Sequence, residues 1–467
     1  MRSTLPFRSI TELADLIGRR EISPVDLVEA LLKRIERLDP QLNSYITVCA
    51  DSALEAAGKA EQSIQASGPS TPLHGIPIVH KDNLWTRGVL TTAHSKILAD
   101  FVPKRDATPV ARLAAQGMIL LGKTNTTEFA CGDMAEYGPT RNPWDLGRFS
   151  GASSGGSASA LAAGLAVAAT GSDTAGSIRA PASMCGVVGV KPTYGRVSRY
   201  GLDPLSWSMD NVGPMTRTVA DAALLLTAMS GYDPLDPKTS RRPVPDFTSE
   251  LGPDLTGLRL GVSKAYFFEG LEPDVERAAL SALEQFEALG AELREVALPS
   301  AGDLAACGNV LVMSEAFGRH AERLRAHASD YGPKARRRIG AGAFCSAAEI
   351  EHAAQLRAAW NLELADGMRE VDALITPTLP ATAFSLETQL AGPPDTSWAT
   401  RHFNLSGYPA LTLPCGFDAT GLPIGLQVAT KPFQESTMFR VAHAYEQATE
   451  WHERRPETPE LEDDRDG

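Results

Sequence analysis

Apolar residues recur at helical spacing through the first part of the chain. Ser9 and Glu12 form a capping-box pattern ahead of a short helix. Ser23, followed by Pro24 and Asp26, opens a second helix with the sequence DLVEALLKRIERL. A third amphipathic pattern covers residues 51–64. The chain is therefore expected to begin with three helices.

Strand and helix patterns alternate from residue 76 onward. The apolar run IPIVH, which begins at Ile76, predicts a buried strand that leads into Lys81. A helix PVARLAAQ, a strand MILLG after Gly117 and a helix capped by Asn125 or Thr126 follow. Later come a helical SASALAAGLA, a strand near LAVAATGSD, strands LRLGV and ELREVAL around a helix, and strands DALIT and PALTLP. This order predicts an α/β fold with one large domain and a mixed β-sheet core covered by helices on both faces.

The domain is expected to span residues 1–453, with N-terminal helices in residues 9–65 packed on it. Residues 231–257 are rich in Pro and polar residues, and we interpret them as a surface crossing within this domain. Residues 454–467 are charged and poor in apolar side chains, which predicts a flexible tail.

Composition narrows the class of protein. The chain has 467 residues, 43% hydrophobic and 22% charged, which is ordinary for a globular protein. Its formal charge of −13 argues against sequence-independent binding of nucleic acid, which depends on Lys and Arg. The run Arg336–Arg338 is interpreted as a solvated face. We therefore expect no nucleic-acid partner.

The cysteines and the N-terminus favour a cytoplasmic protein. The six cysteines are scattered without a C-x-x-C pair, as expected for reduced thiols: Cys49, Cys131, Cys185, Cys307, Cys345 and Cys415. The N-terminus lacks the apolar segment of a secretion signal, and no stretch approaches 18 uninterrupted apolar residues. His74, His80 and His94 lack acidic or Cys partners at ligand spacing. We expect no membrane contact, no metal and no cofactor.

Two short motifs suggest other activities. GMILLGKT, from Gly117 to Thr124, matches the phosphate-binding loop expression, but its Met-Ile-Leu-Leu run is typical of a buried strand whose amides belong to a sheet. GASSG, from Gly151, matches the nucleophile-elbow expression and would make Ser153 the nucleophile. The residues before it look like a loop, where an elbow requires a strand. Of the late histidines that could complete a triad, namely His402, His443 and His452, the last two lie in a predicted terminal helix. We therefore consider phosphate binding and an α/β-hydrolase triad less well supported than the interpretation that follows.

Two Ser- and Gly-rich segments together with Lys81 suggest hydrolysis of an amide. The segments are SGASSGGSASA from Ser150 and GSDTAGSIRAPAS from Gly171. Glycine lets backbone N–H groups approach a ligand closely, and a serine in such a loop can serve as a nucleophile. A lysine activates it only when neutral, and burial lowers a lysine pKa from about 10.4 toward 7 to 8. Lys81, at the end of a buried strand, is suitably placed.

The chain resembles the amidase signature family, which carries similar Gly-Ser blocks. Segments such as PLHGIPIVHKDN, RNPWD, GVVGVKPTYGRVSRYG and NLSGYPALTLPCGF resemble family segments in the same order over nearly the whole chain. The resemblance implies Lys81 as base, Ser153 as a bridging serine in a cis peptide, and Ser177 as nucleophile. The two serines are 24 residues apart (177 − 153), as in the family. Ala152 and Ala175 replace glycines that are usual there.

The resemblance also implies the surroundings of the nucleophile. The oxyanion hole would be formed by the backbone N–H groups of Thr174, Ala175, Gly176 and Ser177. Three further residues would support the loop, namely Ser154, Asp173 and Arg179. Arg179 is interpreted either as one half of a structural ion pair or as a group that faces an anionic part of the substrate.

We interpret the protein as an amidase that hydrolyses the C–N bond of a linear carboxylic amide through a Ser177 acyl-enzyme, with Lys81 and Ser153 passing the proton. Anilides, carbamates or esters would be further substrates. The alternative is the glutaminase A-subunit of a tRNA-dependent amidotransferase, which needs partner subunits and an ammonia channel. The partner expected for the first interpretation is a small-molecule amide, and a homodimer is compatible with it.

Overall fold

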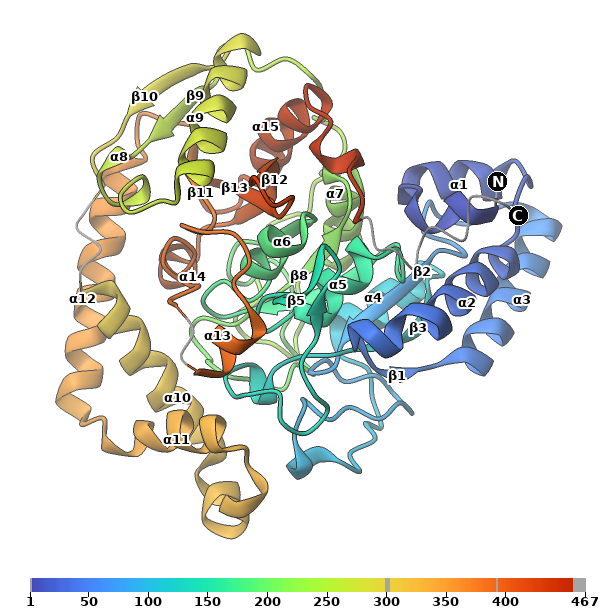
Figure 1. Ribbon diagram of the computed structural model, residues 1–467, viewed down its shortest axis with the longest axis horizontal. Coiled ribbons are helices and arrows are strands. Elements are labelled where there is room, and N and C mark those ends of the chain that lie inside the picture. Colours follow the sequence, from blue (N-terminus) through green and yellow to red (C-terminus); the bar gives the residue numbers. More distant parts are fainter. Residues whose placement is uncertain (1, 299–302, 392–393, 457–467) are drawn as a thin grey trace.

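The computed structural model describes residues 2–298, 303–391 and 394–456 (Figure 1). Within these residues an 11-stranded sheet runs through the molecule in the order β1-β3-β2-β6-β8-β7-β12-β13-β11-β9-β10. A two-stranded ribbon, β4-β5, stands apart from it. Most of the predicted tail, residues 457–467, lies outside the described residues.

The sheet is mixed, as the alternation of patterns predicts. β2 is parallel to β3 and β6, and β9 is parallel to β10 and β11, whereas the strands from β6 through β8, β7, β12 and β13 to β11 pair antiparallel. The strands are β1 Tyr45–Val48, β2 Pro77–Lys81, β3 Ile119–Thr124, β4 Arg141–Asn142, β5 Asp145–Phe149, β6 Ala169–Asp173, β7 Val188–Lys191, β8 Asn211–Thr216, β9 Arg259–Val262, β10 Glu292–Glu295, β11 Ala373–Pro377, β12 Ala410–Phe417 and β13 Pro423–Thr430.

Helices cover both faces of this sheet. The α-helices are α1 Ile10–Gly18, α2 Pro24–Leu42, α3 Ala50–Ser67, α4 Thr108–Ala115, α5 Gly155–Ala162, α6 Arg179–Cys185, α7 Val219–Met229, α8 Lys264–Phe267, α9 Pro273–Ala288, α10 Leu304–His327, α11 Pro333–Ala341, α12 Ala347–Gly367, α13 Leu386–Ala391, α14 Arg401–Ser406 and α15 Glu435–Gln447. Short 3-10 helices are η1 Arg2–Phe7, η2 Lys96–Leu98, η3 Glu128–Ala130, η4 Ala328–Asp330, η5 Gly342–Phe344 and η6 Trp451–Glu453. α5 and α6 pack together against the sheet, and α7, α9 and α15 form a second group that also contacts it. The predicted fold class is confirmed.

The first two helices begin where the sequence predicts. Ser9 and Ser23 each accept a hydrogen bond from the backbone three residues on, and Glu12 and Asp26 return the bond, so both capping boxes form. No helix in the described part of the chain is both long and apolar enough to cross a lipid bilayer.

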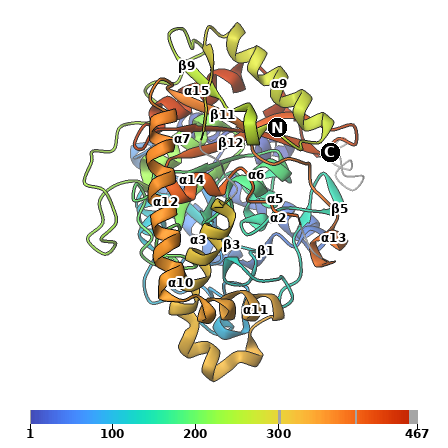
Figure 2. The ribbon, with the colours of Figure 1, turned by 90° about the vertical axis from the view of Figure 1, so that its left-hand side faces the viewer.

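α10, α11 and α12 form a helical extension at one end of the molecule (Figures 1 and 2). They pack on one another and, through α10 and α12, on the short helix α14. A second cluster of buried apolar side chains lies beneath them, including Leu311, Trp360 and Phe403. The extension therefore has a core of its own next to the end of the sheet.

Two local predictions differ from the structure. Instead of a helix capped by Asn125, residues 125–127 are irregular and only the turn η3 follows. The Asn125 side chain is engaged by His94 Nδ1 (2.7 Å) and by the backbone of Asn43, and Phe129 has a φ of 47°, which interrupts a helix. The segment before Ser153 is a hairpin, β4-β5, whose turn is held by the Asn142 side chain, which accepts from Trp144 N (3.1 Å).

Candidate active site

The candidate site lies where two parallel strands end side by side. Lys81 is the last residue of β2, and Asp173 is the last residue of β6. Because β2 and β6 run parallel, their carboxyl ends meet at the same edge of the sheet. β6 continues into the loop that carries Ser177 and then into α6. The fold thus brings together groups that are about 70 to 100 residues apart in the sequence.

Lys81 contacts Ser153 directly. Its Nζ donates to Ser153 Oγ over 2.6 Å and to Ser172 Oγ over 2.9 Å. Lys81, Ser153 and Ser172 are almost completely buried. The peptide bond between Ala152 and Ser153 is cis, and α5 begins two residues later. The lysine and the predicted bridging serine are therefore neighbours in the structure.

The surroundings of Lys81 favour its neutral form. Burial lowers the pKa of Lys81 to about 7, although the carboxylates of Asp173 and Asp210 act in the opposite direction. Asp210 is itself engaged, since it accepts from Thr174 Oγ1 over 2.6 Å. At neutral pH a substantial fraction of Lys81 is thus an amine that can accept a proton.

Ser177 lies on the loop between β6 and α6 and lines a cavity of about 140 Å³. Its carbonyl oxygen accepts from Ser154 N over 3.1 Å, which ties the two Ser-rich segments together. Among the described residues none forms a hydrogen bond with Ser177 Oγ, so the hydroxyl is free to turn toward a ligand. Gly176 has a φ of 125°, and a Cβ there would collide with Thr400 Oγ1. The loop needs glycine at this position.

Asp173 fixes the conformation of the loop that carries Ser177. Its carboxylate accepts from Gly176 N (2.8 Å) and Ile178 N (3.1 Å) and forms a buried ion pair with Arg179 (3.0 Å). Asn404 donates to the same carboxylate over 2.9 Å. Burial opposes ionisation of Asp173, but Arg179 and Asn404 outweigh it and hold its pKa at about 2. Arg179 is fully buried, and its remaining donors go to Gln427 (2.7 Å) and Asn404 (2.6 Å), which favours the ion-pair interpretation.

One of the four predicted oxyanion donors is already engaged. The Gly176 N–H donates to Asp173, whereas the N–H groups of Thr174, Ala175 and Ser177 have no hydrogen bond to any residue in the described ranges. Ala175 has a negative φ, so alanine fits this position without backbone strain. Three N–H groups of residues that line the Ser177 cavity are therefore available to a ligand oxygen.

Apolar and basic side chains both line the cavity beside Ser177. Leu205, Met209 and Val312 are among the apolar ones. Arg338 and Arg401 are its two arginines among the described residues, and Arg401 pairs with Asp395 over 2.7 Å. The run Arg336–Arg338 is thus not solely a solvated face, because Arg338 reaches the cavity and donates to Cys131 O (2.9 Å). Neither arginine could be assigned from sequence, since each comes from a helix far from the two serine segments.

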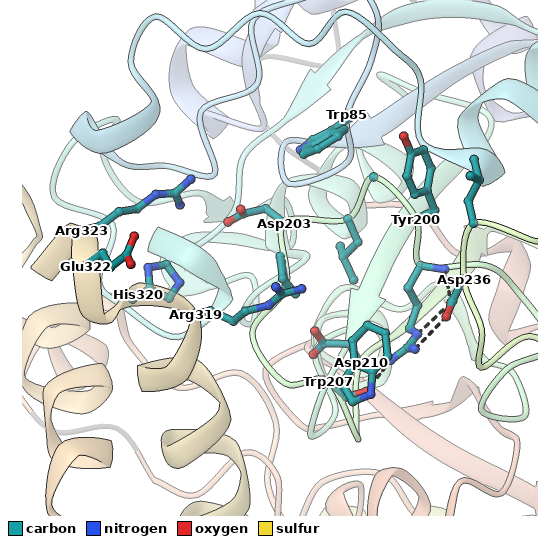
Figure 3. A pocket seen from close by; sticks show the side chains of 15 residues that line it. Trp85, Tyr200, Asp203, Trp207, Asp210, Asp236, Arg319, His320, Glu322 and Arg323 are labelled. Carbon is teal, nitrogen blue, oxygen red and sulfur yellow. Dashed lines mark hydrogen bonds and ion pairs between the residues drawn. The ribbon is translucent and has the colours of Figure 1, made fainter.

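A larger cavity of about 470 Å³ is lined in part by the same stretch of chain as the Ser177 cavity, through Pro204, Trp207 and Asp210 (Figure 3). Asp203 and Asp210 form part of one wall, and Arg319 and Arg323 of α10 lie opposite. Leu205 and Met209 face the Ser177 cavity, while Trp207 faces the larger one. Residues 204–210 therefore contribute to the linings of both cavities.

The two rival motifs do not form the sites that their expressions describe. Residues 119–124 are strand β3, paired with β2 and β1, and Lys123 Nζ donates to Leu84 O (2.8 Å) and Thr91 Oγ1 (2.7 Å), so no phosphate cradle exists there. His402 is buried among aromatic rings, and burial lowers its pKa to about 3.

In place of a histidine, Ser153 has Lys81 as its partner. Among the described residues, no group of three or more His, Cys, Asp or Glu side chains could hold a metal ion.

Comparisons with known proteins agree over nearly the whole chain. A family model described as Amidase matches residues 26–439. The A-subunit of the glutamyl-tRNA(Gln) amidotransferase of Geobacter sp. (strain M21) is 42% identical over 474 residues, covering 95% of this chain and 98% of that protein. The solved structure of the corresponding A-subunit from Thermotoga maritima has a TM-score of 0.81 and 37% identity, covering 95% of each chain.

A second solved structure, reported as a vestigial protein complex that reveals the origins of an s-triazine catabolic enzyme, has a TM-score of 0.90. It is 33% identical and covers 97% of this chain and 100% of that chain.

These relatives correct the expected partners. The first interpretation of the sequence expects a small-molecule amide and no nucleic acid, and is compatible with a homodimer. That expectation is wrong, because relatives more than 40% identical to this chain belong to an amidotransferase complex named for a tRNA. The net charge of this chain does not predict whether a complex that contains it binds nucleic acid. In such a complex, other subunits can make the contacts with the nucleic acid.

Proposed function

Because this chain belongs to the amidase signature family, and is an enzyme of that family, we propose that it is the glutamine-hydrolysing A-subunit of a tRNA-dependent amidotransferase. It releases ammonia from the side-chain amide of glutamine and leaves glutamate. The observation that carries the proposal is the buried contact of 2.6 Å between Lys81 Nζ and Ser153 Oγ, beside the Ser177 loop. Relatives named as A-subunits of a glutamyl-tRNA(Gln) amidotransferase, more than 40% identical along almost their full length, support the choice of glutamine as the substrate.

The proposed reaction starts with neutral Lys81. The amine takes the proton of Ser153 while Ser153 takes that of Ser177, and Ser177 Oγ bonds to the amide carbon. The carbonyl oxygen becomes an oxyanion that accepts from the N–H groups of Thr174, Ala175 and Ser177. The C–N bond then breaks as the proton returns through Ser153 to the nitrogen, and ammonia leaves. Water attacks the acyl-enzyme by the same proton path in reverse, which frees Ser177.

The two arginines in the lining of the cavity suit the rest of the substrate. Glutamine carries an α-carboxylate, and Arg338 and Arg401 line the cavity that holds Ser177. A guanidinium group binds a carboxylate through two parallel hydrogen bonds, so an arginine here would fix the amide in front of the nucleophile. The apolar residues Leu205, Met209 and Val312 would contact the methylene groups.

The test is hydrolysis of glutamine by the purified chain, alone and with its candidate partner subunits. We expect glutamate and ammonia in equal amounts, and an acyl or fluorophosphonate adduct on Ser177 in the digested protein. Ser177→Ala should lose both turnover and adduct, and Arg338→Ala should raise the KM for glutamine more than it lowers kcat. An adduct on Ser153, or full activity of Ser177→Ala, would overturn the catalytic assignment.

One observation favours a second candidate, an amidase for an anionic amide without an amino group. Of the described residues that line the Ser177 cavity, two are arginines and none is Asp or Glu, and the Asp395 carboxylate next to this lining is already paired with Arg401. Glutaramic acid, which is glutamine without its amino group, separates the two. A kcat/KM at least tenfold higher for this compound than for glutamine would favour the amidase, and the reverse order would favour the amidotransferase.

A further inference from the structure

Most of the polar atoms around the Lys81 amine belong to one residue. Nζ lies 2.6 Å from Ser153 Oγ, 2.9 Å from Ser172 Oγ and 3.4 Å from the Ser172 carbonyl oxygen. Within the described ranges no other atom forms a hydrogen bond with Nζ. Ser172 is the next-to-last residue of β6 and is buried, like Lys81 and Ser153. It supplies two of the three neighbours.

A neutral amine has two N–H donors and one lone pair. If the lone pair is to take the proton of Ser153, both hydrogens must point at other acceptors, because a buried unpaired N–H is unfavourable. The two acceptors left are the hydroxyl and the carbonyl oxygen of Ser172. We propose that Ser172 is a positioning residue that directs the lone pair of Lys81 toward Ser153. This inference rests on the proposed role of Lys81 as the base.

Asn83 holds the Ser172 hydroxyl from the opposite side. Its Nδ2 donates to Ser172 Oγ over 2.9 Å, and Asn83 is buried two residues beyond Lys81. The pairing of Val79 with Ala169 sets β2 and β6 in the register that brings Lys81 near Ser172. The backbone of Ser172 is also held, because its carbonyl oxygen accepts from Ser154 Oγ over 3.3 Å. Ser172 is therefore fixed independently of Lys81.

Ser172 also affects the basicity of Lys81. The ammonium form has three N–H donors, and the same three oxygen atoms match them. Hydrogen bonds from a charged donor are roughly twice as strong as neutral ones, so the Ser172 hydroxyl stabilises the ammonium form more than the amine. The charged groups that face Lys81 are Asp173 and Asp210, and both raise its pKa against the effect of burial. Loss of the hydroxyl should therefore lower the pKa of Lys81.

The experiment measures how fast a fluorophosphonate modifies Ser177 between pH 5 and 9, which requires no knowledge of the natural substrate. In the wild type the rate should rise with pH as Lys81 loses its proton. In Ser172→Ala the plateau should fall about 10- to 100-fold, which is no more than the smallest usual contribution of a general base, because Lys81 itself is still present. The midpoint should move down by roughly half to one pH unit, since a charged hydrogen bond is lost.

Two further variants test the direction of the shift. Asn83→Asp places a carboxylate beside the same hydroxyl and should move the midpoint to higher pH, because a nearby anion stabilises the ammonium form. Ser172→Thr keeps both acceptors and should restore the midpoint of the wild type. Ser157→Ala is the matched control, since Ser157 is a buried serine that donates to the same strand at Thr170 O (2.9 Å), and it should leave the midpoint in place.

The possible results separate this inference from the proposed function. If Ser172→Ala lowers the rate equally at every pH, its role is only structural and the inference fails. If Ser172→Ala does not fold, Asn83→Asp decides, and an unmoved midpoint overturns the inference. If Lys81→Ala is modified as fast as the wild type, the base itself is wrong, and the proposed reaction fails with it.

Discussion

Removing the charge of Asp173 should strongly destabilise the protein. The carboxylate has five hydrogen bonds, from Gly176 N, Ile178 N, two nitrogens of Arg179 and Asn404 Nδ2. In Asp173→Asn the new amide NH₂ faces at least one of these donors, and the fully buried Arg179 loses its counter-charge. Breaking a buried ion pair in this way costs about 3 to 5 kcal/mol.

The pKa of Asp173 gives a second, somewhat smaller value for its contribution to the free energy of unfolding. A carboxyl whose pKa falls from 3.8 to about 2 on folding contributes roughly 2.5 kcal/mol at neutral pH. Because the pKa is lowered in the folded state, this contribution is complete above about pH 4 and is lost as the pH falls toward 2. The wild type should therefore lose stability over this acid range, and Asp173→Asn should lack that part of the dependence.

Urea unfolding at pH 7, followed by tryptophan fluorescence, measures the difference. Asp366→Asn is the control, because Asp366 pairs with Arg369 at the exposed surface of α12, where an ion pair contributes little. We expect a clear fall in the midpoint for Asp173→Asn and none for the control. A loss below about 1 kcal/mol for Asp173→Asn would refute the view that this buried network holds the nucleophile loop.

Three further outcomes follow from the site. Modification of Ser177 by a fluorophosphonate should rise with pH around 7, because burial lowers the pKa of Lys81 to about 7 and only the amine is a base; a rate that is flat from pH 5 to 9 would contradict this. Ser153→Ala should slow amide hydrolysis about 100- to 10,000-fold while the Ser177 adduct still forms slowly, as mass spectrometry of the intact protein would show. Gly176→Ala should disorder the loop and abolish modification, because its φ of 125° disfavours a side chain and its Cβ would collide with Thr400 Oγ1; Thr400→Ala alone should be much milder, and equal effects would argue against strain.

Much of the fold is determined by local sequence. The capping boxes at Ser9 and Ser23, the apolar run before Lys81 and the alternation of strands and helices predict the first helices, β2 and a mixed sheet covered on both faces. These patterns succeed because they depend on neighbours within a few residues. The helix expected at Asn125 fails for the converse reason, since its capping side chain is engaged by distant residues, among them His94.

For the site, the sequence alone determined which residues could supply the chemistry: a lysine at the end of a buried strand and two Ser- and Gly-rich segments. Only the tertiary structure decided how they meet. It surrounds Lys81 with Ser153 and Ser172, buries it enough to lower its pKa to about 7, and brings Arg338 to the Ser177 cavity. The physical reason is that burial and hydrogen-bond partners depend on strands and helices distant in the sequence, and no local pattern records which of them will pack together.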